Sequence, residues 1–167
     1  MTLERLYRDV YESPGDDRRR LVLADALLER ADPRGELIML QFQTHALARK
    51  RAKKLIDRHR AQFLGPLCNV VKHGSDEWRK GFLVGCVAHA SGATADCPAW
   101  ATVKRIDVLA DRTAEVDLLA SKWLRSLEEV RVLSDDETFW RGVHVAQTRV
   151  KVLRVLERTN RVRLLKA

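Results

Sequence analysis

An aliphatic repeat in the second half of the chain constrains the fold more than any other feature. Three segments fit the pattern L-x-x-L-x-L and begin at Val103, Leu127 and Val150, so their starts are 24 and 23 residues apart. A weaker copy begins at Gly81. This spacing lies in the range of leucine-rich repeats, in which stacked copies bury the apolar face that one copy alone cannot bury. The repeat predicts a stack of strands near 81–87, 103–109, 127–133 and 150–156.

The length of the connections predicts that these strands are parallel. About 16 residues separate one strand from the next, which is far more than a hairpin needs. The predicted fold class is therefore α/β, with a helical bundle capping a short leucine-rich-repeat-like solenoid whose parallel sheet has about four strands.

The first 67 residues are predicted to form the helical bundle. Asp16 and Asp32 stand where helix N-caps belong, and Pro33 suits the first position of a helix. Four groups of apolar residues recur at helical spacing; in the third, the stripe runs from Leu37 to Leu47. The fourth, over residues 52–63, is either a separate helix or a continuation of the third. We expect residues 1–67 and 68–167 to be two domains packed as one unit.

Residues 16–41 read DDRRRLVLADALLERADPRGELIMLQ. This segment resembles the bacterial repeat-companion domain, which is named for its position N-terminal to leucine-rich-like repeats. The resemblance covers about the first forty-five residues and departs from the family at Ala26, where the family usually has tryptophan. It implies a helical architecture and an association with repeats, and it carries no enzymatic activity.

Parallel stacking predicts columns of charged side chains on the solvent face of the sheet. Neighbouring parallel strands lie about 4.8 Å apart, so opposite charges in one column become neighbours worth about 0.2–1 kcal/mol each. These pairs either only satisfy the sheet surface or form a face that binds another protein, with Arg154 as an unpaired donor. The candidate partner-binding residues are Arg105, Asp107, Glu129, Arg131 and Arg154.

Two basic segments leave nucleic-acid binding open as an alternative. Residues 44–60 and 149–166 each hold seven basic residues and one acidic residue, within a net charge of +8. Such segments attract phosphate backbones, but they also occur as solvated helix faces and cationic tails. Neither contains Trp or Tyr for base stacking. The candidate nucleic-acid contacts are Arg49, Lys50, Arg51, Lys53, Lys54 and Arg58.

We expect no catalytic residues, no metal and no cofactor. Three cysteines and two histidines fall within thirty residues, but Cys86 and His89 lie three apart on one predicted strand and would point to opposite faces. The chain has no C-x-x-C pair, no apolar run of about 20 residues and no apolar signal segment. These features favour a cytoplasmic protein without membrane contact.

Overall fold

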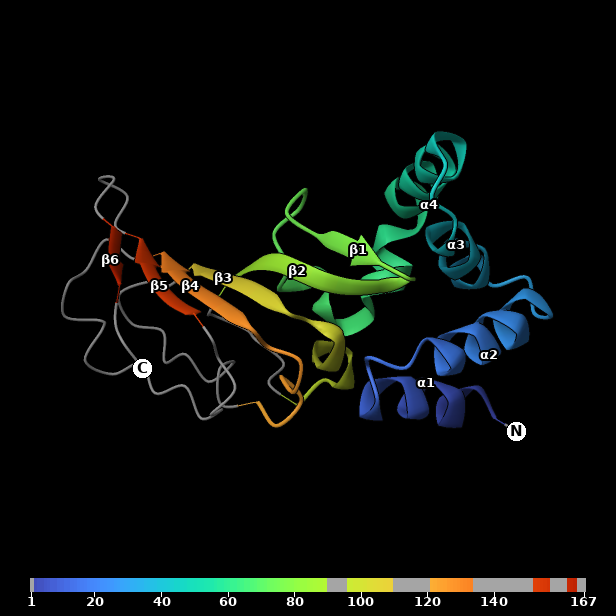
Figure 1. Cartoon of the computed structure of the whole chain (residues 1–167), viewed down its shortest axis with the longest axis horizontal. Helices are drawn as coiled ribbons and strands as arrows, with labels where there is room; N and C mark the ends of the chain where they lie inside the picture. The colour runs from blue at the N-terminus through green and yellow to red at the C-terminus, as the bar shows by residue number, and fades with distance from the viewer. Residues whose placement is uncertain (1, 90–95, 110–120, 134–151, 157–161, 165–167) are drawn as a thin grey trace.

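The computed structural model describes residues 2–89, 96–109, 121–133, 152–156 and 162–164, which form a mixed α/β arrangement of helices and one sheet (Figure 1). The α-helices of the described residues are α1 (Leu3–Glu12), α2 (Asp17–Leu28), α3 (Pro33–Phe42) and α4 (Ala46–Leu64). The sheet is built of β1 (Glu77–Arg79), β2 (Phe82–His89), β3 (Arg105–Leu109), β4 (Glu129–Leu133), β5 (Val152–Leu156) and β6 (Val162–Leu164). Short 3-10 helices follow α4 and precede β3.

Helices α2 and α3 begin where the sequence predicts. A carboxylate oxygen of Asp16 accepts the backbone N–H of Arg18 at 2.9 Å, which caps α2. Asp32 caps α3 in the same way, with Pro33 at the first helical position.

The prediction that the third helix continues through Thr44 to Leu47 is wrong. The helix ends at Phe42, and Gln43 is extended. His45 then starts α4, because its Nδ1 accepts the backbone N–H of Ala48 at 3.2 Å. Leu47 is 64% exposed on the first turn of this new helix.

Helices α2 and α3 approach each other closely at Gly35. A Cβ at this position would lie 2.9 Å from both Ala24 O and Leu28 N, so only glycine allows this contact. The helices in turn rest on the sheet, since Phe82 of β2 shares one buried cluster with α1, α2 and α3. The fully buried members of that cluster are Val10, Leu23, Ala24, Leu27 and Ile38.

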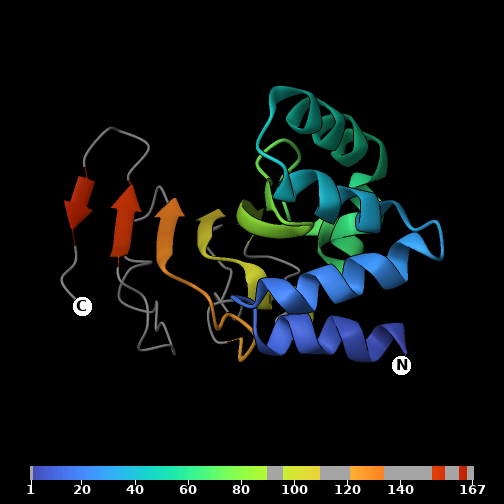
Figure 2. The ribbon, with the colours of Figure 1, turned by 45° about the vertical axis from the view of Figure 1, so that its right-hand side comes forward.

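The strands lie in the order in which they occur in the sequence, and β2 to β5 are parallel (Figure 2). Ile106, Val130 and Leu153 are partners in register across β3, β4 and β5. The predicted parallel stacking of the three later repeat segments is therefore confirmed. Two short antiparallel strands, β1 and β6, were not predicted; they pair with β2 and β5 at the two edges of the sheet.

The first copy of the repeat has a different frame from the predicted one. Cys86 pairs with Ile106 and Ala88 with Val108, so the buried pattern is Leu83-x-x-Cys86-x-Ala88 and does not start at Gly81. Gly81 instead lies in the β1–β2 turn with φ +82°. The apolar residues of this segment fit both frames, and the hairpin selects one of them.

The inner face of the sheet carries the largest core cluster. Cys86, Ile106 and Val130 contribute from three neighbouring strands, and Trp100 is fully buried beneath them. Leu64 and Leu67, at the end of α4 and just after it, belong to the same cluster. The helices therefore gather at the β1–β2 end of the sheet, and β6 lies at the opposite end (Figure 1).

Candidate functional site

The charged side chains of β3 and β4 come together in the predicted columns. Arg105 is the partner of Glu129, and Asp107 is the partner of Arg131. Arg154 of β5 is the register partner of Arg131, so its backbone position continues the second column. We call the surface formed by Glu77, Arg105, Asp107, Glu129 and Arg131 the charged sheet face.

Arg131 is the centre of the ion pairs on β3 and β4. Its Nη2 lies 2.9 Å from Glu129 Oε1, and its Nε also donates to that oxygen at 3.0 Å. The same Nε lies 3.9 Å from Asp107 Oδ1. The predicted neighbour Asp107 is thus within ion-pair distance, but the closer partner of Arg131 is two residues away on its own strand.

Glu77 of β1 is a member of this surface that sequence reasoning missed. Its carboxylate pairs with Arg105 Nη2 across the sheet. Gly85 of β2 lies between these two strands, and a Cβ there would come within 2.8 Å of Glu77 Oε2. Glycine therefore leaves the space that the Glu77 carboxylate occupies. The only sequence signal for it is the Lys80-Gly81 dipeptide, whose glycine favours a turn and so a preceding strand.

The charged sheet face is half-buried. The exposed fractions of the Arg105, Glu129, Arg131 and Asp107 side chains are 35%, 23%, 28% and 19%. Arg105 Nε and Asp107 Oδ1 are buried without a hydrogen-bond partner. Burial raises the pKa of Asp107, and the nearby Arg131 and Arg105 only partly oppose this effect.

We expect Asp107→Asn to be at least as stable as the native chain at pH 7. The folded state binds the Asp107 proton more tightly than the unfolded state does. The free energy of unfolding therefore falls as pH rises from the ordinary pKa of this carboxyl, 3.8, through its raised pKa in the folded state. In urea denaturation, the gain in unfolding free energy of Asp107→Asn over the native chain should therefore vanish below about pH 4. A loss above about 1 kcal/mol at pH 7 would show that the contact with Arg131 dominates.

Asp76→Asn is the matched control, because the pKa of Asp76 is shifted in the opposite direction from that of Asp107. Burial acts to raise the pKa of Asp76, but hydrogen bonds from Trp78 Nε1 at 2.7 Å and Arg60 Nε at 2.9 Å lower it overall. This carboxylate therefore contributes stability at neutral pH that is lost as pH falls through its lowered pKa. Asp76→Asn should lower the free energy of unfolding at pH 7. The difference in unfolding free energy between this variant and the native chain should become smaller at acidic pH.

The predicted nucleic-acid residues form a separate surface on α4. All six are exposed, while Ala48 and Ala52 on the opposite side of the helix are buried. Arg51 pairs with Glu36 at 2.9 Å, and no other residue of the six has an acidic partner within the described part of the chain. Trp78 lines a hollow of about 630 Å³ together with Arg49 and Lys53, so one aromatic ring lies beside this surface.

Cys86 and His89 do not form a reactive pair. Cys86 is 2% exposed in the core, and burial raises the pKa of its thiol to about 12, so it remains protonated at neutral pH. His89 is exposed at the end of the same strand. Across the described ranges, no group of three or more His, Cys, Asp or Glu side chains is placed to hold a metal ion.

No protein-family model, no curated protein and no solved structure matches this chain. None of the helices in the described part of the chain is long and apolar enough to cross a membrane. The fold and the charged sheet face therefore carry the functional argument by themselves.

Proposed function

We propose that this chain is a non-enzymatic protein-interaction module that binds another protein through the charged sheet face. The observation that carries the proposal is the parallel register of β3 and β4. That register gathers four charged side chains from two strands on one surface, with a fifth to a third of each side chain exposed. Side chains already held by ion pairs lose little further freedom on binding, which favours recognition of a partner of complementary mixed charge.

We also propose that strands β2 to β5 are rungs of a degenerate leucine-rich-like solenoid and that residues 1–67 are its N-terminal cap. In-register partners are separated by 20, 24 and 23 residues along β2 to β5. Phe82 links the first rung to three helices. The proposal extends the resemblance to the repeat-companion domain, since a cap of this kind covers the exposed apolar end of a repeat stack.

Affinity capture with charge-reversal variants tests the proposed surface. We expect Arg131→Glu combined with Arg154→Glu to lose the proteins that the native chain captures. Both changes replace a positive charge by a negative one in the column that Asp107, Arg131 and Arg154 share. Lys53→Glu combined with Arg58→Glu changes the net charge equally on α4 and should keep them. Circular dichroism of each variant shows whether it is folded. Retention of the same proteins by the sheet variant would refute the proposed docking face.

Nucleic-acid binding through α4 is the second candidate. It is favoured by the five basic side chains of the predicted set that lack an acidic partner among the described residues, and by Trp78 beside them. The same two variants separate the candidates, because an α4 interface requires loss of binding in the Lys53 and Arg58 variant only. That binding would also weaken steeply with salt, since it would depend on counterion release.

A further inference from the structure

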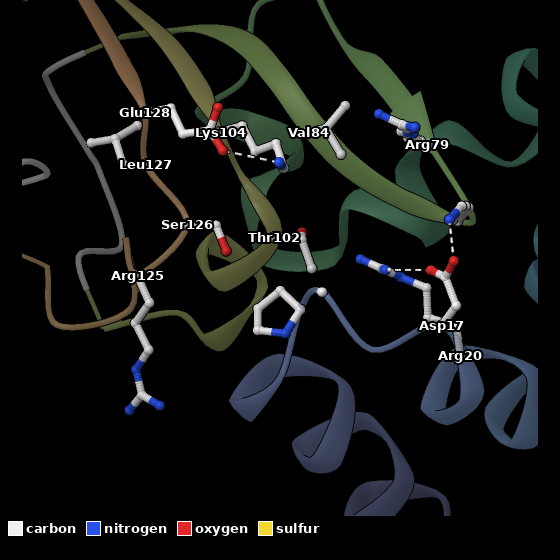
Figure 3. Close-up of a pocket in the computed structure, with 13 residues that line it drawn as sticks. Asp17, Arg20, Arg79, Val84, Thr102, Lys104, Arg125, Ser126, Leu127 and Glu128 are labelled. Carbon is white, nitrogen blue, oxygen red and sulfur yellow. Dashed lines mark hydrogen bonds and ion pairs between the residues drawn. The ribbon is translucent and has the colours of Figure 1, made fainter. Parts of the chain in front are cut away.

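A cavity lined by charged side chains lies where the helices meet the beginning of the parallel strands. Its volume is about 720 Å³, which is within the usual range for small-molecule sites. The turn before α2, the β1–β2 turn and the residues that precede β3 and β4 all line it (Figure 3). It is distinct from the charged sheet face, because none of the five residues of that surface lines it.

Arg20 of α2 is the most buried of the described charged residues that line this cavity. Its side chain is 8% exposed, and its Nε is buried without a hydrogen-bond partner. Its Nη1 reaches only one oxygen of Asp17, at 3.4 Å. Figure 3 shows the Arg20 guanidinium beside Asp17, directed toward the interior of the group of lining residues. A buried guanidinium with remaining donors is a group that an anion can satisfy.

The charges around Arg20 do not balance. Among the described residues that line the cavity, Arg20, Arg79, Lys80 and Lys104 are opposed by two carboxylates, those of Asp17 and Glu128. Asp17 pairs with both Arg20 and Lys80, and Glu128 pairs with Lys104 at 3.0 Å. Arg79 has no acidic partner among the described residues. The group therefore has an excess of two positive charges.

A fifth cation at the rim does not contribute to this excess. The Arg125 guanidinium lies 5.1 Å from the centre of the Trp123 ring. In Figure 3 it is turned away from the other lining side chains. Arg125 is therefore not part of the site.

We propose that this cavity binds the phosphoryl group of a small phosphorylated molecule. A phosphate monoester carries about −1.5 to −2 charges at pH 7, which matches the excess of the cavity. Its three terminal oxygens accept the planar donors of arginine, and the remaining volume accommodates the esterified group. Arg20 binds the phosphate from the buried side, and Arg79 and Lys104 bind it from the solvent side.

Calorimetric titration of the full chain tests the site, with inorganic phosphate and ribose 5-phosphate as probes at constant ionic strength. We expect saturable binding of one equivalent. Arg79→Gln combined with Lys104→Gln removes two exposed charges and should weaken binding at least tenfold. Arg5→Gln combined with Arg8→Gln removes the same charge from exposed positions on α1, outside the cavity, and should leave the affinity unchanged. Arg20→Lys keeps the buried charge but loses the planar donors, so it should also weaken binding.

Amide chemical shifts locate the probe independently of affinity. The expected changes centre on Gly15, Thr102 and Ser126, which line the cavity. Tighter binding of ribose 5-phosphate than of inorganic phosphate would identify an ester as the ligand, and the reverse would identify the free ion. Absence of saturable binding, or equal weakening by the α1 control variant, would overturn the proposal.

Discussion

Gly81→Ala is expected to destabilise the chain by about 3–5 kcal/mol, because two separate costs add at this position. Its φ of +82° lies in the left-handed region, which costs an L-residue roughly 1–2 kcal/mol. The new methyl group would also lie 2.2 Å from Ile38 Cγ1, in the core shared by the helices and β2. Urea denaturation followed by circular dichroism measures the loss of unfolding free energy.

Gly74→Ala separates the two costs. Gly74 has nearly the same φ, +78°, but no atom lies within 4 Å of the position of a Cβ. This variant should therefore lose only the conformational term, about 1–2 kcal/mol. Equal losses at Gly74 and Gly81 would mean that the contact between the β1–β2 turn and α3 is not tight.

Arg34→Met is expected to cost about 3–5 kcal/mol, since it removes two buried hydrogen bonds from a charged donor. The Arg34 side chain lies between the helices and the sheet. Its Nη1 donates to Gly81 O at 2.9 Å and its Nη2 donates to Phe63 O. Its guanidinium carbon also lies 5.2–5.8 Å from the ring centres of Tyr7, Phe63 and Phe82. Methionine keeps the apolar stem but leaves both carbonyl oxygens unsatisfied.

Arg18→Met is the control for this change. Arg18 is exposed on the first turn of α2, so the same substitution there should alter the unfolding free energy by less than about 0.5 kcal/mol. Both variants are compared in urea at one pH and salt concentration. A loss below about 1 kcal/mol for Arg34→Met would show that Arg34 does not hold the helices on the sheet.

Features that depend on residues close together in the chain, or on a regular spacing, could be predicted from the sequence. Asp16 and Asp32 cap their helices as predicted, because a cap depends only on residues within one turn. Ile106, Val130 and Leu153 align because their segments repeat at nearly constant spacing, and parallel register brings equivalent positions together. The column that joins Asp107 and Arg131 follows from the same register.

Contacts that join distant segments depend on how the elements pack in the folded chain. Lys80 reaches Asp17 across 63 residues, and Arg34 reaches Gly81 across 47. Glu77 enters the charged sheet face only because the hairpin places β1 beside β2, and the same hairpin selects the frame of the first repeat. No periodicity encodes such pairings, because they depend on how the helices pack onto the edge of the sheet. The repeat could therefore be predicted from the sequence, whereas the cavity around Arg20 could not.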